Sequence, residues 1–437
     1  EPDTGTDAPV TNGVFPCMPA VGTLEAVNNS LTMNFGDPIY TVGSGETDGN
    51  GKGNFEFVPP TDFLALCTAN LPEIEIGQEA DDLAHDHFNT VLYTGNTTSP
   101  RTISGVGFEP ALTVLSGRSI SSAKIVYDDV RGAGSDKMLT WNGTSVEGYD
   151  GSYTGAAYGF LSAFNSDGFV LTDGSTNGNW VNNDGSTFVS WNWKAGTAFD
   201  NDQSATGVGS IDSEGQVNTD AGFSIIKYTG GGAAATIAHG LGAVPEMIIL
   251  KRRDGGAGGW YVYHANSNSA PEQKYLQLQL TDAIADGTFP WNDTAPTSAV
   301  FSVGSDTGVS GSGTTYIAYL FKSVEGYSSF GSYKGNGSTD GTFIYTGHPV
   351  SWIMTKRTDS ADNWAIYDNT RNTFNVRTKY ILADSDQAET TYSTALVDFL
   401  SNGFKWRGAV NFGNNSSGTY VYMAFSSGTG FKYGNAI

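Results

Sequence analysis

The stretch Thr187-Phe188-Val189-Ser190-Trp191-Asn192-Trp193-Lys194 decides the interpretation of the chain, because two variants of it occur further along. They read Thr315-Tyr316-Ile317-Ala318-Tyr319-Leu320-Phe321-Lys322 and Thr419-Tyr420-Val421-Tyr422-Met423-Ala424-Phe425-Ser426. Successive side chains of a β-strand point to opposite faces. One face is apolar in all three stretches: Val189, Trp191 and Trp193; Ile317, Tyr319 and Phe321; Val421, Met423 and Phe425. The alternation predicts three equivalent strands that turn this face into a core.

Other landmarks accompany the strand in a constant order. A proline followed by an apolar run is followed 17, 18 and 18 residues later by a tyrosine near the end of a second strand: Pro110 and Tyr127, Pro245 and Tyr263, Pro349 and Tyr367. A Tyr-x-Gly turn precedes each set, at residues 93–95, 228–230 and 333–335. Asp167-Gly168 and Asn402-Gly403 supply the positive φ of hairpin turns, whereas the middle set lacks such a dipeptide before Phe301. The near-constant spacing indicates three divergent copies of one unit.

The copies predict an all-β fold of tandem antiparallel β-sandwich domains after a different, N-terminal β module. The 57 glycines and the 12% of aromatic residues are typical of short strands joined by tight turns. Frequent short strands favour sandwiches over a solenoid. We place the N-terminal module at residues 1–77, repeat 1 at 78–200, repeat 2 at 201–327 and repeat 3 at 328–437.

Four stretches predict a particular local structure. The acidic, glycine-rich stretch Asp200–Gly222 predicts a link between repeats 1 and 2. Asp384–Leu400 is the best helix candidate, and Ala283–Asp286 is expected to form one helical turn. Tyr275–Leu280 alternates apolar and polar residues and predicts a strand.

The charge balance argues against two classes of partner. The 437 residues include 45 acidic and 22 basic side chains, for a net charge of −23. Nucleic-acid binding needs a basic footprint to neutralise phosphates, and none is visible. Binding to an anionic membrane surface is disfavoured for the same reason, and no apolar run of about 18 residues predicts membrane insertion. An acidic surface suits a salty or extracellular setting.

Both cysteines, Cys17 and Cys67, lie in the N-terminal module. A disulfide scaffold would need more cysteines, so two buried free thiols are favoured, with a disulfide as the open alternative. The chain opens with Glu1-Pro2-Asp3 and shows no signal peptide. It is therefore processed, or part of a longer polypeptide, or in no need of a secretion signal.

Part of the N-terminal module resembles a known domain. The phrases Asn34-Phe35-Gly36, Pro59-Pro60 and Phe63–Pro72 are similar to the C-terminal half of a SPRY-type β-sandwich. The first half of such a domain is not visible. The resemblance implies a β module that is completed elsewhere or belongs to a fragment.

The remaining chain resembles repeat-containing, tail-fibre-like structural proteins of marine bacteriophages. The phrases that carry the likeness are Tyr228-Thr229-Gly230, His239-Gly240-Leu241-Gly242, Ser323–Tyr327 and Tyr420–Phe425. The resemblance implies a virion appendage without catalytic residues, located at the virion surface or outside the cell. It also implies a homo-oligomer, because tail fibres are usually trimeric, although no heptad segment is present to drive a trimer.

Metal-ligating residue types gather in only a few places. His85 and His87, with Asp81 and Asp82 nearby, could share a cation if they lay on one strand, but an exposed acidic linker is the favoured interpretation. Asp384 and Asp386, and the loop 182–185, offer oxygen ligands for a structural calcium ion, but none is a complete EF-hand loop, and solvated turns are favoured. No cofactor is expected.

Tryptophans raise the question of sugar binding, because aromatic faces stack on sugar rings. The repeat pattern assigns Trp191 and Trp193 to the core. Trp141, Trp180, Trp291 and Trp406 lie in less patterned stretches and are the candidates for glycan contact, with burial as the favoured interpretation.

Together these observations predict a non-enzymatic phage virion protein, a tail-fibre or capsid-appendage segment that adheres to a host glycan or protein receptor and contacts other virion proteins. Repeated modules would provide avidity from weak contacts. A cellular adhesin or extracellular filament subunit is the first alternative. A glycan-degrading appendage is the second, because two well-placed carboxylates would suffice for it, whereas no nucleophile elbow or P-loop is present.

Overall fold

The computed structural model describes residues 42–61, 63–66, 70, 83–150, 153–176 and 180–428. Contacts divide the chain into two compact units, Glu1–Pro72 and Glu73–Ile437, which are described separately. Both cysteines, residues 34–36 and the two aspartates at 81 and 82 lie outside the described residues.

A turn around one aspartate organises the described part of the first unit. An antiparallel bridge joins Glu46 to Phe55. The buried Asp48 carboxylate accepts hydrogen bonds from the backbone N–H groups of Lys52 and Ala65, both at 2.8 Å. These bonds tie two neighbouring segments together, and the SPRY likeness of this unit stays a prediction.

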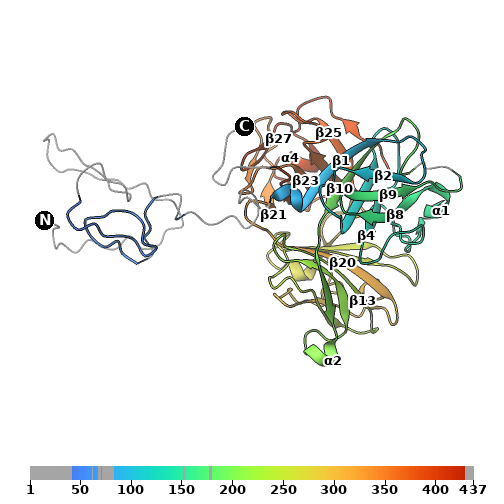
Figure 1. Ribbon diagram of the computed structural model, residues 1–437, viewed down its shortest axis with the longest axis horizontal. Helices are drawn as coiled ribbons and strands as arrows, with labels where there is room; N and C mark the ends of the chain where they lie inside the picture. Colours follow the sequence, from blue (N-terminus) through green and yellow to red (C-terminus); the bar gives the residue numbers. More distant parts are fainter. Residues whose placement is uncertain are drawn as a thin grey trace. The chain divides into compact units, whose positions relative to one another are not determined.

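The second unit is built almost wholly from strands (Figure 1). Repeat 1 contains η2 (Ala84–Asp86), β1 (Phe88–Thr94), β2 (Arg101–Ser104), β3 (Leu112–Gly117), β4 (Ile125–Asp128), β5 (Leu139–Thr140), β6 (Tyr149–Asp150), β7 (Tyr153–Thr154), α1 (Gly155–Tyr158), β8 (Phe160–Asn165), β9 (Gly168–Thr172) and β10 (Thr187–Trp193). Repeat 2 contains β11 (Thr197–Asn201), α2 (Gln203–Thr206), β12 (Ser213–Asn218), β13 (Phe223–Thr229), β14 (Ala235–Ala238), β15 (Met247–Arg252), β16 (Trp260–His264), η3 (Pro271–Gln273), β17 (Lys274–Gln277), β18 (Ala285–Asp286), β19 (Val300–Val303), α3 (Thr307–Ser310) and β20 (Thr315–Phe321). Repeat 3 contains β21 (Ser328–Lys334), β22 (Phe343–Tyr345), β23 (Trp352–Arg357), β24 (Trp364–Asp368), β25 (Lys379–Leu382), β26 (Thr390–Thr391), β27 (Val397–Leu400), β28 (Gly403–Trp406), α4 (Asn411–Asn414) and β29 (Thr419–Phe425).

Each repeat has a large inner sheet and a small outer sheet, and the described strand pairs are antiparallel. The inner sheets have the orders β1-β10-β3-β4-β5, β11-β12-β13-β20-β15-β16-β17-β18 and β21-β29-β23-β24-β25-β26. The outer sheets are β2-β9-β8, β14-β19 and β22-β28-β27. The predicted all-β class is confirmed, and the strand orders match between repeats, with β10, β20 and β29 at the same place in each inner sheet.

One central core is shared by all three repeats. Trp193, Phe321 and Phe425, at the ends of the equivalent strands β10, β20 and β29, all belong to it. The Phe425 ring centroid lies 5.7 Å from that of Trp193 and 6.1 Å from that of Phe321. The apolar faces predicted from the alternation are therefore buried, and they are buried against one another. In Figure 1 the repeats occupy three sectors around this core.

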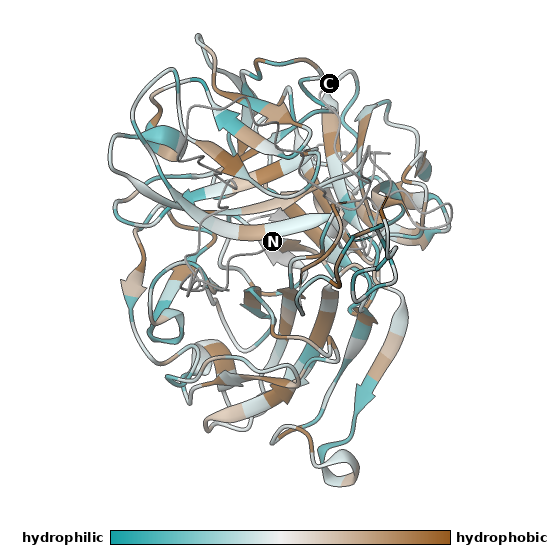
Figure 2. Cartoon of the chain, turned by 90° about the vertical axis from the view of Figure 1, so that its left-hand side faces the viewer, coloured by the Kyte–Doolittle hydropathy of each residue, from teal (hydrophilic) through white to brown (hydrophobic). Residues whose placement is uncertain are grey.

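The opposite face of each inner sheet is also buried, against the outer sheet of its own repeat. Tyr316 and Leu320 of β20 belong to a core of repeat 2, and Tyr420 and Ala424 of β29 belong to a core of repeat 3. Repeat 1 has the corresponding core around Phe169 and its neighbours. Each inner sheet is thus buried on both faces, and Figure 2 shows hydrophobic colouring along the strands and hydrophilic colouring mainly in the loops.

The Tyr-x-Gly turn has one structural role in all repeats. The Tyr333 hydroxyl donates a hydrogen bond to the carbonyl of Gly413 (2.8 Å), and the Tyr333 ring stacks on Tyr420. A Cβ atom on Gly335 would lie 2.3 Å from the carbonyl oxygen of Asn415, so only glycine allows this close approach. Tyr93 and Tyr228 donate to Val181 and Val309 in the same way, at 2.8 and 2.7 Å.

Backbone hydrogen bonds join the repeats at three equivalent junctions. The N–H groups of Gly258, Asp362 and Ser122 donate to the carbonyls of Thr144, Thr281 and Asp386, at 2.8, 2.7 and 2.9 Å. The N–H groups of Glu147, Ile284 and Glu389 donate in the opposite direction to Arg253, Thr358 and Arg118, at 2.8, 3.0 and 2.9 Å. Repeat 2 thus contacts repeat 1, repeat 3 contacts repeat 2, and repeat 1 contacts repeat 3. The contacts close into a ring with approximate three-fold symmetry.

An ionic cluster stabilises the junction between repeats 1 and 2. Glu147 pairs with Arg253 (2.7 Å) and Arg131 (3.2 Å), and Arg131 also pairs with the buried carboxylate of Asp128. The Tyr319 hydroxyl of repeat 2 donates to this carboxylate over 2.6 Å. Removing one partner of a buried carboxylate is destabilising, because the charge loses compensation without gaining water.

The junction between repeats 1 and 3 repeats this cluster. Glu389 pairs with Arg118 (3.0 Å) and Arg371 (3.1 Å), and Arg371 pairs with buried Asp368. The indole N–H of Trp191 donates to Asp368 over 3.0 Å. Trp191 is the counterpart of Tyr319 in the repeat pattern, so one interaction recurs with a different donor.

The third junction, between repeats 2 and 3, has different residues at the positions of the ionic cluster. Ile284 and Thr358 stand where the other junctions have a glutamate and an arginine, and His264 stands where they have an aspartate. The imidazole Nε2 of His264 lies 3.1 Å from the carbonyl oxygen of Tyr422, next to Met423. Burial lowers the pKa of His264 to about 4, so the imidazole is neutral near pH 7.

One buried lysine lies at each junction. The ammonium groups of Lys251 and Lys356 donate to carbonyls across the junction, those of Thr144 (3.3 Å) and Thr281 (2.7 Å). Repeat 1 has a serine at the matching position, and Lys124, which directly precedes β4, supplies the ammonium group, which donates to the carbonyl of Gln387 (3.2 Å).

Several local expectations were wrong. Asp200–Gly222 is not a plain link: β11 and β12 form a hairpin that extends the inner sheet of repeat 2, so that sheet begins at Thr197, before the boundary placed at residue 201. Asp384–Leu400 contains β26 and β27 instead of a helix, and Ala283–Asp286 contains β18 instead of a helical turn. In both stretches the backbone hydrogen bonds go to other segments instead: Glu389 and Ile284 donate to another repeat, and the residues that follow pair with β25 and β17. The strand predicted over Tyr275–Leu280, in contrast, is confirmed for residues 275–277, which lie in β17.

Candidate functional site

Three of the four tryptophans considered for glycan contact are buried. Trp141, Trp291 and Trp406 are 3%, 2% and 0% exposed, in keeping with the favoured interpretation of burial, so they are not available for glycan contact. Trp406 aligns with the buried Leu171, because both lie two residues after the phenylalanine that pairs with the edge strand of the outer sheet. That equivalence was available in the sequence. Trp180 is half-buried and lies in an aromatic cluster.

Trp180 marks a position that is occupied by an aromatic ring in two repeats. It precedes Val181, just as Phe412 precedes Gly413, and both carbonyls accept the equivalent tyrosine hydroxyl described above. The Trp180 ring stacks on Tyr158, with centroids 5.6 Å apart.

The corresponding cluster of repeat 3 contains three half-buried rings. Phe412 lies 5.0 Å from Tyr380 and 6.2 Å from Tyr392, measured between ring centroids. Tyr380 is the second residue of β25, and Thr390 in β26 lies opposite it.

Repeat 2 has the cluster in a rearranged form. Gly308 takes the place of Phe412, and a Cβ atom there would lie 3.0 Å from the ring of Tyr261, which occupies the space. Tyr261 contacts Tyr275 (5.7 Å) and Phe289 (5.2 Å), and Tyr275 is the β17 counterpart of Tyr380. All three rings are half-buried.

These three groups, called the aromatic clusters, are Tyr158 and Trp180; Tyr261, Tyr275 and Phe289; and Tyr380, Tyr392 and Phe412. They lie at related positions of the three outer surfaces, and each presents partly exposed ring surface with nearby hydroxyl groups. Aromatic rings of this kind provide flat contact area for the apolar face of a ligand. The sequence interpretation found only Trp180; aligning the repeats on Tyr93, Tyr228 and Tyr333 would have added Phe412.

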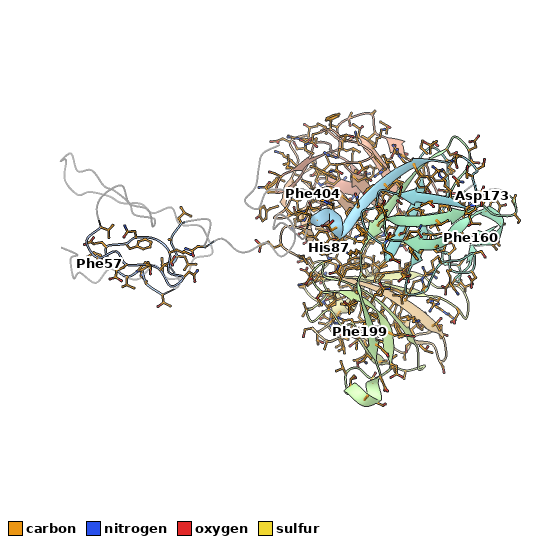
Figure 3. All side chains as sticks on the ribbon, in the orientation of Figure 1. Phe57, His87, Phe160, Asp173, Phe199 and Phe404 are labelled. Atoms are coloured by element: carbon orange, nitrogen blue, oxygen red, sulfur yellow. The ribbon has the colours of Figure 1, made fainter. Side chains whose placement is uncertain are left out.

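The histidine pair does not have the expected placement. His85 lies in η2 rather than on a strand, with its Nε2 atom 3.7 Å from Asp86. His87 is buried where repeats 1 and 2 meet, and its Nδ1 atom lies 2.9 Å from the amide nitrogen of Asn218 (Figure 3). Within the described ranges, no group of three His, Cys, Asp or Glu side chains could hold a metal ion.

Asp384 occupies a structural position of the repeat. Its carboxylate accepts the backbone N–H of Trp364 (3.1 Å), and the amides of Asn142 and Gln279 accept the matching N–H in the other repeats (2.8 Å in both). Burial raises the pKa of Asp384 to about 6. Asp386 contributes its backbone carbonyl to a junction.

The loop 182–185 is likewise engaged within the fold. The buried side chain of Asn182 accepts a hydrogen bond from Arg101 (2.7 Å) and donates to the carbonyl of Thr98 (2.9 Å). Asn414 holds the matching place in repeat 3 and donates to the carbonyl of Ser338 (2.9 Å). These amides act as loop supports at matching positions.

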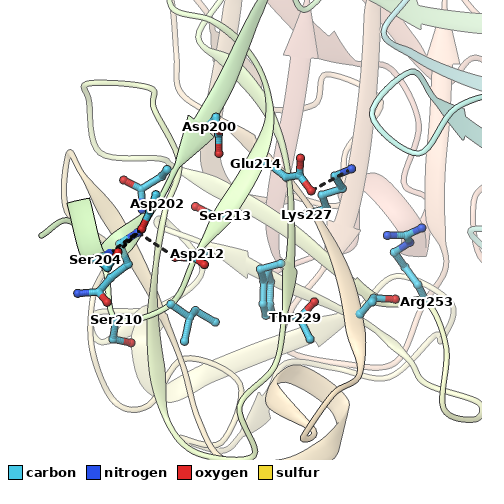
Figure 4. A pocket seen from close by; sticks show the side chains of 15 residues that line it. Asp200, Asp202, Ser204, Ser210, Asp212, Ser213, Glu214, Lys227, Thr229 and Arg253 are labelled. Atoms are coloured by element: carbon cyan, nitrogen blue, oxygen red, sulfur yellow. Dashed lines mark hydrogen bonds and ion pairs between the residues drawn. The ribbon is translucent and has the colours of Figure 1, made fainter. Parts of the chain in front are cut away.

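A polar groove of about 880 Å³ lies beside the β11–β12 hairpin, between α2 and β13 (Figure 4). The Asp202 carboxylate caps α2 by accepting hydrogen bonds from the hydroxyl (2.6 Å) and the N–H (2.9 Å) of Ser204, which lower the pKa of Asp202. Asp212 accepts the N–H of Gln203 (2.8 Å), and Glu214 pairs with Lys227 (3.2 Å). Most of the carboxylates that line the groove are thus engaged in holding the hairpin.

No helix within the described part of the chain is both long enough and apolar enough to cross a membrane.

The comparison with known families concerns the whole ring. A family described as a domain of unknown function, DUF7483, matches residues 84–428. The match begins in η2 and ends three residues after β29, so it takes in all three repeats. No curated protein matches the chain. Because the match covers well over half of the sequence, the protein belongs to the DUF7483 family, and one unit of that family corresponds to the three-repeat ring.

Proposed function

We propose that the protein is a non-enzymatic adhesion module of a phage virion appendage, which binds a host-surface glycan through its three aromatic clusters. The observation that carries the proposal is the recurrence of partly exposed rings at related outer positions of all three repeats, centred on Trp180, Tyr275 and Tyr380. Core packing alone does not require partly exposed aromatic rings in every repeat.

The ring arrangement suits weak, repeated binding. Three sites on one rigid unit convert modest affinities into avidity when a polysaccharide presents many copies of its repeating sugar. An acidic, closed β structure also suits a particle surface, because its charge opposes self-association. The same proposal includes a homo-oligomer, such as a trimer, within the virion. This part rests on the resemblance to tail-fibre-like proteins.

Glycan binding is tested with purified protein on a glycan array and on host polysaccharide. Trp180→Ala, Tyr275→Ala and Tyr380→Ala should each weaken binding severalfold, and the triple variant should lose binding to the polysaccharide. Phe374→Ala is the matched control, since this ring is 80% exposed and lies outside the clusters. Retention of wild-type binding by the triple variant, or no glycan binding by the wild type, would contradict the proposal.

The virion assignment has its own test. Labelled antibodies against the second unit should decorate purified particles in negative-stain images at a discrete appendage. Decoration of cell surfaces without particles would favour the cellular adhesin instead.

A further inference from the structure

One strand of repeat 3 has an open hydrogen-bonding edge. Within the described residues, β22 pairs with β28 and with no other strand. The N–H of Thr346 donates to Asn402 (3.0 Å), so the even-numbered residues of this segment face β28. Because backbone groups of an antiparallel strand alternate in direction, the N–H and carbonyl groups of Phe343 and Tyr345 face away from β28.

The equivalent edge in repeat 2 is covered by the chain itself. Ile237 of β14 corresponds to Ile344 of β22, because each lies opposite the matching phenylalanine of its outer sheet. Ile211 forms a parallel bridge with Ile237. The N–H of Ser210 donates to the carbonyl of Thr236 (2.8 Å), and the N–H of Thr236 donates to the Ser210 hydroxyl (2.8 Å).

The covering segment extends along the whole strand. The Ser213 hydroxyl donates to the carbonyl of Ala238 (2.9 Å), and the half-buried Ile211 side chain packs on the core of repeat 2. Thr236 and Ala238 are the counterparts of Phe343 and Tyr345. The backbone groups that Ser210–Ser213 satisfies in repeat 2 are therefore the ones that stay open in repeat 3.

The side chains at the open edge differ as well. Phe343 is 42% exposed and Tyr345 is 68% exposed, at positions where repeat 1 has Thr102 and Ser104. Edge strands in soluble proteins are usually short, charged or covered. An aromatic residue at each open position of β22 instead supplies apolar contact for a strand laid beside it.

We propose that the β22 edge accepts an extended segment of another polypeptide, which pairs in parallel as Ser210–Ser213 pairs with β14. The segment would place an aliphatic side chain at the position of Ile211 and small polar residues on either side of it. Strand addition of this kind derives affinity from main-chain hydrogen bonds and specificity from alternate side chains. The proposal is independent of glycan binding.

The chain supplies its own probe. A fluorescently labelled peptide with the sequence of residues 208–215, Val-Gly-Ser-Ile-Asp-Ser-Glu-Gly, is titrated with the full chain, and binding is followed by anisotropy. Saturable binding is expected. A peptide with aspartate in place of its isoleucine should bind at least about tenfold more weakly, because the aliphatic contact is lost.

The variant Tyr345→Pro removes an open N–H and leaves the β22–β28 ladder bonds in place, so it should weaken peptide binding about tenfold or more. Ser104→Pro, at the matching position of repeat 1, is the control and should bind like the wild type. If Tyr345→Pro lowers the thermal unfolding midpoint, Tyr345→Asp is used in its place. In addition, amide hydrogen exchange in β22 of the wild type must become slower when peptide is added.

The peptide could instead displace Ser210–Ser213 from repeat 2. The Tyr345 variants would then bind it as tightly as the wild type does, and that result would overturn the proposal. Failure of the wild type to bind at peptide concentrations up to about 1 mM would overturn it too.

Discussion

The hydroxyl of Tyr319 in repeat 2 donates a hydrogen bond of 2.6 Å to the buried carboxylate of Asp128 in repeat 1. Trp191 of repeat 1 makes the matching bond to Asp368 of repeat 3 over 3.0 Å. At the third junction His264 meets a backbone carbonyl of repeat 3 over 3.1 Å. Contacts at three corresponding places thus connect the repeats in one cyclic order, and the ring closes around a common core.

Tyr319→Phe should lower the free energy of unfolding by about 1–3 kcal/mol, because the buried Asp128 carboxylate loses one hydrogen-bond partner without gaining water. Denaturant unfolding measures the change. Tyr345→Phe is the matched control: its ring is 68% exposed, and the change should stay within about 0.5 kcal/mol. Equal effects of the two substitutions would show that the junction bond adds no stability.

Gly335→Ala should destabilise the protein by more than about 2 kcal/mol, because its Cβ would lie 2.3 Å from the carbonyl oxygen of Asn415. Thermal unfolding measures the shift. Gly231→Ala provides the comparison, since a Cβ there meets no atom within 4 Å and the glycine does not have a positive φ. That variant should be neutral or slightly stabilised, and a loss of stability similar to that of Gly335→Ala would refute the close-approach argument.

The junction lysines predict an increase of stability with pH. Burial lowers the pKa of Lys124 and Lys251 to about 7 and that of Lys356 to about 8, from an ordinary value of 10.5. Between these values the unfolded chain binds more protons than the native protein, so the free energy of unfolding rises with pH. From pH 7 to pH 9, below tyrosine ionisation, the rise should be at least about 1 kcal/mol.

The lysine contribution is separated from other groups by Lys251→Met, which keeps a long apolar stem and removes the ammonium group. Its free energy of unfolding should rise less steeply between pH 7 and pH 9 than that of the wild type. Lys334→Met is the control, because Lys334 is exposed and its removal should leave the slope unchanged. A Lys251→Met slope as steep as that of the wild type contradicts the assigned burial cost.

The sequence predicts which face of β10, β20 and β29 is buried. It does not predict that the three buried faces pack against one another in one core. Alternation in β29 shows that Met423 and Phe425 are buried, but a buried face contacts a neighbour that alternation does not identify. The same residues would serve three separate sandwiches. Only the placement of Phe425 against Trp193 and Phe321 shows that the repeats share one core.

The wrong helix prediction and the missed aromatic clusters have different physical origins. The helix predicted over Asp384–Leu400 rests on local propensity, whereas Glu389 makes its ion pairs and its backbone bond with other parts of the ring, and these tertiary contacts override propensity. The favoured burial of Trp406 agrees with its counterpart Leu171, which is apolar and buried. The aromatic clusters were missed because their rings come from separate segments that meet only in the folded repeat.

The central claim, that the repeats form one structural unit, is tested most directly by Phe425→Ala in repeat 3. Its ring contacts aromatic residues of all three repeats, including Phe88 and Phe330, so truncation should cost about 3–5 kcal/mol. Hydrogen exchange followed by mass spectrometry, with peptides from each repeat, reports where that cost falls. We predict that slow amides in β10, β20 and β29 lose protection by the same factor. Loss confined to repeat 3, with wild-type protection in repeats 1 and 2, would contradict the shared core.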